Sequence, residues 1–279
     1  MRVWTLLLIA VLPFGVVACA SESDERPEGS ESAPSGDHRS APVEATFALE
    51  DATRIEDRSP ELFTQGLEFG DDGSLFHSGG RYGESRVVKT DASGAVMAEH
   101  ELSDEYFAEG LTIVGDELYL LTWRENVVQV LSTDDLTERR TYSLSTEGWG
   151  TCYSDAGVLW VSDGTDEVRG YNPADMSEQT SLTIADSDGD AIENINELEC
   201  IDGEIWANLW QEERIIVFDE DTGEIVRMLD FSDLTPDRAG RDEVLNGIAF
   251  HADADEIWLT GKRWEHFFVF DYAELRCSQ

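Results

Sequence analysis

The chain has almost no lysine. Of its 19 basic residues only Lys89 and Lys262 are lysines, whereas 60 residues are Asp or Glu, which gives the 279 residues a formal net charge of −41. Such a surface repels the nucleic-acid backbone and anionic membrane surfaces, so neither is an expected partner. Many carboxylates with few lysines are typical of salt-adapted proteins, although plain solubility charge gives a similar composition. We expect an acidic, halophilic protein.

Metal-binding motifs are also missing. No Cys-x-x-Cys, Cys/His cluster or His-x-x-x-His pair occurs, so a zinc site is not expected. Asp186–Asp190 and Glu197 resemble a calcium loop, but Ala191 takes the place of the glycine such a loop needs, and no flanking helices are evident. An acidic turn is favoured, and calcium binding there stays open. We expect no cofactor and no metal in catalysis.

The N-terminus is predicted to direct export. Residues 1–18 combine an early arginine with an apolar run that is too short to span a membrane. The sequence Val-Val-Ala-Cys at 16–19 fits a bacterial lipoprotein signal and predicts lipidation of Cys19, the alternative being an ordinary signal with a chance cysteine. Residues 19–45, rich in Ser, Glu, Pro and Gly, are expected to form a disordered tether. These features predict a protein anchored in the cell envelope, in the periplasm or at the outer membrane, that contacts the membrane through its lipid alone.

From residue 46 to 279 the chain lacks any long stretch of helical periodicity. Short apolar strands alternate with Gly and Asp turns, which indicates an all-β domain. An apolar–aromatic pair after a polar turn recurs five times, with its aromatic at Phe76, Tyr119, Trp160, Trp206 and Trp258. Repeats of about 40–50 residues are typical of propeller blades. The sequence therefore predicts a five-bladed β-propeller, which we expect to be a monomer.

Two cysteines lie near the openings of consecutive repeats. Cys152 belongs to the third repeat and Cys200 to the fourth. They either form a disulfide between neighbouring blades or remain as two buried thiols, and the second reading is the safer one from sequence.

The repeat openings bring polar residues next to aromatic ones. In a propeller the innermost strands line a central channel, so equivalent openings converge at one mouth of it. A carboxylate, an ammonium, carboxamides and indoles would then share one pocket, which is the usual form of an active site. The residues concerned are Phe63, Gln65, Phe107, Glu109, Trp123, Trp149, Asn196, Trp210 and Lys262, and the fifth opening also offers Asn246 and Trp264.

Six motifs in these openings make the chain similar to the plant and bacterial glutaminyl-peptide cyclotransferases. They are Phe-Thr-Gln-Gly-Leu at 63–67, Phe-Ala-Glu-Gly-Leu at 107–111, Gly-Trp-Gly at 148–150, Asn-Glu-Leu-Glu at 196–199, Asn-Gly-Ile-Ala at 246–249 and Thr-Gly-Lys at 260–262. The resemblance implies a five-bladed propeller that converts N-terminal glutamine to pyroglutamate and releases ammonia. It also implies Glu109 as the catalytic acid/base and the other openings as substrate-binding residues. Cys152 and Cys200 depart from the expected motifs, which bears on substrate preference more than on activity.

The implied chemistry suits these side chains. One carboxylate can take a proton from the attacking amine and return it to the leaving nitrogen. Lys262 or an indole N–H would stabilise the oxyanion, and Asn196 and Gln65 would hold the amide and the amine. Two other classes remain open: a non-catalytic envelope propeller that binds partners, and a metal-dependent, lactonase-like hydrolase.

Overall fold

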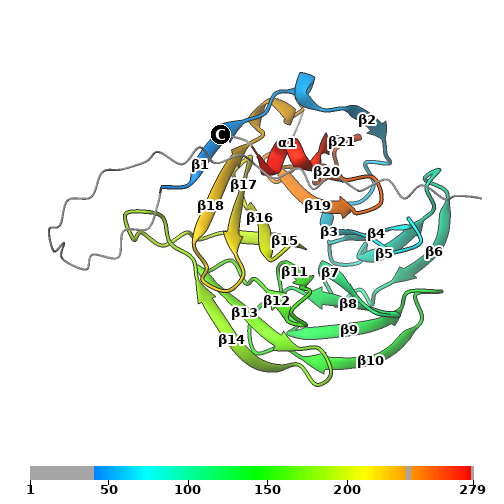
Figure 1. The fold of residues 1–279 in the computed structure, drawn as a ribbon. Coiled ribbons are helices and arrows are strands. Elements are labelled where there is room, and N and C mark those ends of the chain that lie inside the picture. The colour runs from blue at the N-terminus through cyan, green and yellow to red at the C-terminus, as the bar shows by residue number, and fades with distance from the viewer. Residues whose placement is uncertain (1–40, 237–239, 278–279) are drawn as a thin grey trace, which may run out of the picture. The chain divides into compact units, whose positions relative to one another are not determined.

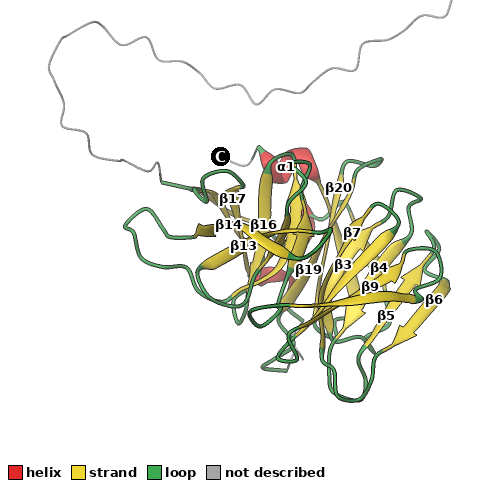
Figure 2. Ribbon diagram, turned by 90° about the horizontal axis from the view of Figure 1, so that it is seen from below, coloured by secondary structure: helices red, strands yellow, loops and turns green. Residues whose placement is uncertain are grey.

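The computed structural model describes residues 41–236 and 240–277, which form five β-sheets arranged around one axis (Figure 1). Strands β3, β7, β11, β15 and β19 lie innermost in the five sheets. The five-bladed β-propeller predicted from the repeat is therefore confirmed. Figure 2 shows that the regular structure of the described residues is almost entirely strand. Within these residues, no helix has the length and apolar character needed to cross a membrane.

Within each blade the strands follow one another outward from the axis in chain order. Blade 1 holds β3 (Thr64–Phe69), β4 (Leu75–Gly79), β5 (Arg86–Thr90) and β6 (Val96–Glu101). Blade 2 holds β7 (Ala108–Val114), β8 (Glu117–Thr122), β9 (Val127–Ser132) and β10 (Glu138–Ser143). Blade 3 holds β11 (Thr151–Tyr153), β12 (Leu159–Val161), β13 (Glu167–Asn172) and β14 (Ser177–Thr183). Blade 4 holds β15 (Ile195–Ile201), β16 (Glu204–Leu209), β17 (Arg214–Asp219) and β18 (Ile225–Asp230). Blade 5 holds β19 (Leu245–His251), β20 (Glu256–Gly261) and β21 (His266–Asp271).

The segment before blade 1 completes the two last blades. Strand β2 (Arg54–Asp57) pairs antiparallel with β21, and β1 (Val43–Thr46) pairs parallel with β18. The predicted C-terminal boundary of the tether, residue 45, is therefore too late. The chain already pairs with β18 in β1, and Ala45 of β1 packs on the core. Residues 1–40, with the predicted signal and Cys19, lie outside the described residues. Three short helices finish the fold: η1 (Leu49–Asp51), η2 (Ser232–Leu234) and α1 (Tyr272–Arg276).

The repeated aromatics lie on the second strand of each blade, where they pack between blades. Tyr119 of β8, for example, is buried in one cluster with Leu159 and Tyr171 of blade 3. Trp206 of β16 is fully buried with Phe270 of blade 5. Burying such rings between neighbouring sheets supplies the hydrophobic stabilisation that closes the ring of blades.

The inner strands approach one another closely near the axis. A Cβ on Gly66 would lie 2.6 Å from the Leu111 nitrogen, and one on Gly110 would lie 2.8 Å from the Gly150 Cα. Only glycine permits this approach. In blade 4 the equivalent residue is Glu197, whose carboxylate accepts hydrogen bonds from the backbone N–H groups of Leu67 (3.3 Å) and Ile248 (3.0 Å).

Glu197 therefore joins the inner strands of three blades through one carboxylate. Glu199 on the same strand accepts from the Phe250 backbone N–H at 2.8 Å. Both glutamates thus bond to backbone groups of neighbouring strands. Burial raises the pKa of both carboxyls well above 4.5.

A disulfide links Cys152 of β11 to Cys200 of β15, with their Cα atoms 5.4 Å apart. The reading as two buried thiols is therefore wrong. The inner strands of blades 3 and 4 lie side by side, which brings the two side chains within bonding reach. The bond closes a loop of sequence separation 48 and ties the two blades together.

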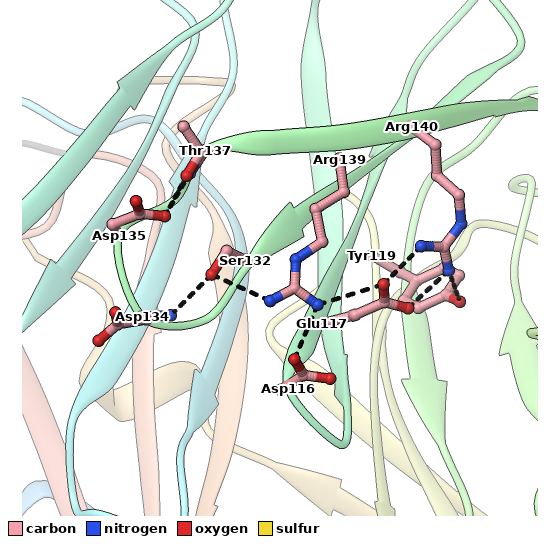
Figure 3. Close-up of polar contacts among 9 residues, drawn as sticks. All are labelled: Asp116, Glu117, Tyr119, Ser132, Asp134, Asp135, Thr137, Arg139 and Arg140. Carbon is pink, nitrogen blue, oxygen red and sulfur yellow. Dashed lines mark hydrogen bonds and ion pairs between the residues drawn. The ribbon is translucent and has the colours of Figure 1, made fainter.

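Arginine side chains cross-link acidic groups on the outer strands. In blade 2, Arg140 of β10 pairs with Glu117 and donates to the Tyr119 hydroxyl at 3.1 Å (Figure 3). Arg139 pairs with Asp116 at 2.8 Å and donates to the Ser132 hydroxyl at 3.3 Å. Such pairs are partly exposed, and because the chain has 60 acidic residues and only 19 basic ones, most carboxylates cannot have a basic partner of their own.

Candidate active site

The residues predicted from the repeat openings meet in one cavity of about 240 Å³. They reach it from all five blades: from the starts of the inner strands and from the turns that follow the second strands. The lining residues are Phe63, Gln65, Phe107, Glu109, Trp123, Trp149, Asn196, Trp210, Asp242 and Lys262. Nine of the eleven residues named from the openings thus lie together, and Asp242 joins them; Asn246 contacts Gln65, and Trp264 is buried in the hydrophobic core.

Breaks in strand register direct the polar side chains toward this cavity. The pairing of β3 with β4 shifts between Thr64 and Gly66, so that Gln65 falls in the irregularity. The corresponding shifts in β7 and β15 contain Glu109 and Asn196. A bulge frees a residue from the ladder and re-aims its side chain, and it is a common device next to active sites.

Serines of the preceding blades satisfy the backbone groups that these bulges free. The Ser78 hydroxyl of blade 1 donates to the Glu109 carbonyl at 2.6 Å, and the Ser162 hydroxyl of blade 3 donates to the Asn196 carbonyl at 2.6 Å. The backbone N–H of Gly110 donates to the Trp149 carbonyl at 2.7 Å. Each irregular strand is therefore held by its neighbour, which fixes the backbone that carries the polar side chain.

Glu109 and Lys262 form a buried pair of opposite charges. Glu109 is 5% exposed and Lys262 is 3% exposed. Burial raises the pKa of Glu109 well above 4.5; the charge of Lys262 opposes this, whereas Glu147 and Glu125 raise it further. Burial lowers the pKa of Lys262 to about 8, against the opposing effect of Glu109 and then Asp242. Burial thus raises the pKa of the acid and lowers that of the base, as expected for charged groups taken out of water.

Two of the indoles that line the cavity are hydrogen-bonded to a glutamate outside it. The Nε1–H groups of Trp123 and Trp149 both donate to Oε2 of Glu147, at 2.8 Å and 3.1 Å. Trp149 meets Trp210 edge-to-face with ring centroids 5.7 Å apart, and Trp123 meets Phe107 at 5.5 Å. On the opposite side, the Lys262 Nζ lies 5.2 Å from the ring centroid of Phe63. The walls are therefore aromatic, and one glutamate outside the cavity orients two of them.

A hydrogen bond to the backbone fixes the orientation of the Asn246 amide, and through it that of the Gln65 amide. Asn246 donates from Nδ2 to the Thr64 carbonyl at 3.0 Å, and the same Nδ2 lies 3.4 Å from Oε1 of Gln65. The Thr64 carbonyl can only accept, so the Asn246 atom that faces it must be the nitrogen, Nδ2. The Gln65 atom that faces this Nδ2 is then the oxygen, Oε1. Gln65 is left with its Nε2 as the free end. Asn196 Oδ1 is buried and has no hydrogen-bond partner among the described residues.

The possible calcium loop forms a compact turn. Asp186 Oδ1 accepts from the backbone N–H groups of Asp188 and Asp190, each at 2.9 Å. Its carboxylate oxygen is therefore engaged by the turn itself. Across the part of the chain that the structure describes, no group of three or more His, Cys, Asp and Glu side chains is placed to hold a metal ion.

Two residues around the cavity, Asp242 and Glu147, were missed from the sequence as site residues. Asp242 lies in the loop before β19, where no repeat motif points to it. Glu147 directly precedes the Gly-Trp-Gly motif, so its position next to a cavity tryptophan was a usable signal. Asn246, from the Asn-Gly-Ile-Ala motif of the fifth opening, occupies the place in β19 that Gln65, Glu109 and Asn196 occupy in their strands; it contacts Gln65 and is not among the residues that line the cavity.

Fold and cavity define a class: a five-bladed β-propeller with a buried carboxylate–ammonium pair inside aromatic walls. A family model described as glutamine cyclotransferase matches residues 33–271. The chain belongs to the glutamine cyclotransferase family.

Two relatives show the extent of the similarity. A glutaminyl-peptide cyclotransferase from Arabidopsis thaliana is 33% identical over 211 residues, which cover 74% of this chain and 65% of the relative. The chain thus spans slightly less than two thirds of that relative's length. The crystal structure of Myxococcus xanthus glutaminyl cyclase is 32% identical with a TM-score of 0.74, and the match covers 82% of this chain and 97% of that one.

Proposed function

We propose that the protein is a glutaminyl-peptide cyclotransferase, which converts the N-terminal glutamine of peptides and proteins to pyroglutamate and releases ammonia. The observation that carries the proposal is the burial of Glu109 and Lys262 together in one aromatic cavity. The family assignment and the relatives named above support the same reaction. The proposed substrate enters with its first residue, because the cavity of about 240 Å³ has room for little more than one side chain.

Glu109 is the proposed acid/base. The α-amino nitrogen of the substrate attacks its own γ-carboxamide carbon, and a proton of the amine passes to Glu109. Glu109 then returns this proton to the amide nitrogen as the bond between that nitrogen and the carbon breaks. The products are a five-membered lactam and ammonia. Because burial raises the pKa of Glu109, its carboxylate is a stronger base than an exposed one.

Lys262 is the proposed stabiliser of the oxyanion that forms when the amine attacks. Of the donors expected from the sequence, the indole N–H groups of Trp123 and Trp149 are taken by Glu147, which leaves Lys262 and the Trp210 indole. Lys262 carries a positive charge and lies in the same cavity as Glu109, so it fits the developing negative charge. With a pKa of about 8, its ammonium is mostly protonated at neutral pH.

The two amides in the cavity suit opposite ends of the substrate's first residue. Gln65 presents Nε2, a donor, which fits the γ-carbonyl oxygen of the substrate. Asn196 presents Oδ1, an acceptor, which fits an N–H of the α-amine. Together with the aromatic walls, these contacts hold the flexible glutamine side chain in the folded shape that cyclisation needs, which lowers the entropic part of the barrier.

The proposal is tested by mixing the purified protein with a peptide that begins with glutamine. Released ammonia and a matching loss of mass from the peptide are expected. Two control peptides should stay unchanged: one with an acetylated N-terminus, which lacks the attacking amine, and one that begins with asparagine, which would have to close a four-membered ring. No ammonia from any glutamine-initiated peptide, in low or high salt, would contradict the proposed activity.

We propose further that the enzyme is exported and held at the cell envelope by a lipid on Cys19. The motif at 16–19 supports this, and it lies outside the described residues. Wild-type protein should sediment with membranes, and Cys19→Ala should release it into the soluble fraction. A wild-type protein that already fractionates as soluble would contradict the anchor.

A further inference from the structure

Glu147 lies behind the aromatic walls of the cavity and is not one of the residues that line it. It belongs to the loop between β10 and β11, where its side chain is 39% exposed. Its Oε2 accepts the indole hydrogens of two tryptophans from different blades: Trp123 follows β8 of blade 2, and Trp149 precedes β11 of blade 3. One oxygen thus links the walls contributed by two blades.

The second carboxylate oxygen extends this arrangement. Oε1 of Glu147 lies 3.2 Å from Nε of Arg124, whose guanidinium carbon is 3.7 Å from the ring centroid of Trp123. The Trp123 indole is therefore held at its N–H and covered on one face by a cation that the same glutamate positions. Hydrogen bonds to an ionised acceptor are about twice as strong as neutral ones, so this contact restrains the ring firmly.

Two further aromatic rings of the cavity wall are restrained because they pack on these tryptophans. Trp123 packs edge-to-face on Phe107, and Trp149 packs edge-to-face on Trp210. Four of the five aromatic rings that line the cavity are therefore either bonded to Glu147 or packed on a ring that is; the exception is Phe63.

We propose that Glu147 is a positioning residue for the cyclisation: its carboxylate fixes the indoles of Trp123 and Trp149, and through them the shape of the cavity that folds the substrate's glutamine. This inference rests on the proposed function. A binding site acts by holding its walls in the productive geometry before the substrate arrives, and supporting hydrogen bonds from outside the site provide that rigidity.

The pH–rate profile gives a second readout, which would not change if Glu147 had only a structural role. The groups that face Glu109 are Lys262, Glu147, Glu125 and the Tyr82 hydroxyl, and Asp242 faces Lys262 in turn. Glu147 is one of the two carboxylates whose repulsion raises the pKa of Glu109. Neutralising it makes Glu109 easier to ionise, so the acid limb of the pH–rate profile should move to lower pH.

The test compares Glu147→Gln with Glu147→Ala. The glutamine keeps an oxygen that accepts the indole hydrogens but carries no charge. We expect a KM for a glutamine-initiated peptide within about threefold of wild type, with the acid limb shifted to lower pH. Alanine removes the acceptor, so KM should rise at least about tenfold, since losing hydrogen bonds to a charged group costs a factor of this order.

A second measurement follows the indoles without any substrate. Indole N–H resonances of Trp123 and Trp149 can be assigned in ¹⁵N-labelled protein with Trp123→Phe and Trp149→Phe. Both should keep a hydrogen-bonded position in Glu147→Gln and move in Glu147→Ala. Glu125→Gln is the matched control: Glu125 also repels Glu109, but it accepts from the Tyr82 hydroxyl and the Phe107 backbone N–H rather than from an indole, so the acid limb should move and both indole signals should stay.

Unmoved indole resonances in Glu147→Ala, or an unchanged KM, would overturn the proposal. So would an acid limb that stays in place in Glu147→Gln. Because the resonances are measured without substrate, the positioning role can fail while the wild type is active. If the wild type releases no ammonia, the proposed function fails, and unmoved resonances would still refute the contact.

Discussion

Replacing Lys262 by methionine should make the protein more stable and less active. Lys262 is 3% exposed, and burial lowers its pKa from 10.5 to about 8. At 1.36 kcal/mol per pH unit, this lowering means that the folded state disfavours the charged form by about 3 kcal/mol. Methionine has a similar length and carries no charge, so Lys262→Met removes this cost and keeps the packing against Phe63.

The expected gain in free energy of unfolding is thus up to about 3 kcal/mol at pH 7, which corresponds to a rise in melting temperature of roughly 6–12 °C for a domain of this size. Its pH dependence has a definite sign. Since the folded pKa lies below the unfolded one, the folded wild type binds fewer protons between about pH 8 and 10.5, and its stability rises with pH there. The advantage of Lys262→Met should therefore be largest below pH 8 and shrink above it.

Turnover of a glutamine-initiated peptide by Lys262→Met should fall about 10²–10³-fold, as for the loss of an oxyanion donor. Thermal unfolding at several pH values and ammonia release measure the two effects separately. Lys89→Met is the matched control, because it removes the other lysine. Lys89 donates to the Thr133 carbonyl at 3.0 Å and lies 3.5 Å from Asp72, outside the cavity, so its loss should give no stabilisation and no loss of turnover. A Lys262→Met variant that is less stable than wild type at pH 7 would refute the reasoning.

Three further outcomes are expected. Exhaustive chelation should leave turnover unchanged, because the described residues hold no group of ligands placed for a metal ion; loss of activity that zinc or calcium restores would contradict this. The melting temperature should rise from low to molar sodium chloride, because salt screens the repulsion within a net charge of −41, and a flat response would remove the argument for salt adaptation. Replacing Cys152 and Cys200 by serine should lower the free energy of unfolding by about 4 kcal/mol, the loop-entropy value for a separation of 48 residues, as measured by denaturant titration; an unchanged value would mean that the bond contributes nothing.

The fold could be predicted from the sequence because each repeat places residues of the same type at corresponding positions. An aromatic at the second strand of each blade, from Phe76 to Trp258, is required wherever neighbouring sheets pack, so its spacing reveals the blades. Most of the cavity residues were equally visible, because they occupy one of two recurring places in the repeat: the start of the inner strand or the turn after the second strand. Strands β1 and β2 carry no such pattern: they pair with the edges of blades 4 and 5 through their backbones, which leaves little mark on side-chain choice.

What the sequence could not predict depends on contacts between segments far apart in the chain. Cys152 and Cys200 pair because β11 and β15 lie side by side, a fact of blade geometry rather than of local sequence. Asp242 reaches the cavity from an irregular loop. Glu147 acts on Trp123, which is 24 residues away, and only the fold shows that one carboxylate meets both indoles.

The central claim is that Glu109 carries the proton in cyclisation. Its repeat twin is Gln65, so a neutral amide is tolerated at the equivalent place, and Glu109→Gln should keep the fold. The most direct measurement is ammonia release from a glutamine-initiated peptide by wild type and Glu109→Gln, with matched folding shown by circular dichroism. We predict a fall of at least about 10²–10⁴-fold while the peptide still binds, because the aromatic walls and Lys262 remain. Equal rates in the two proteins would contradict the account.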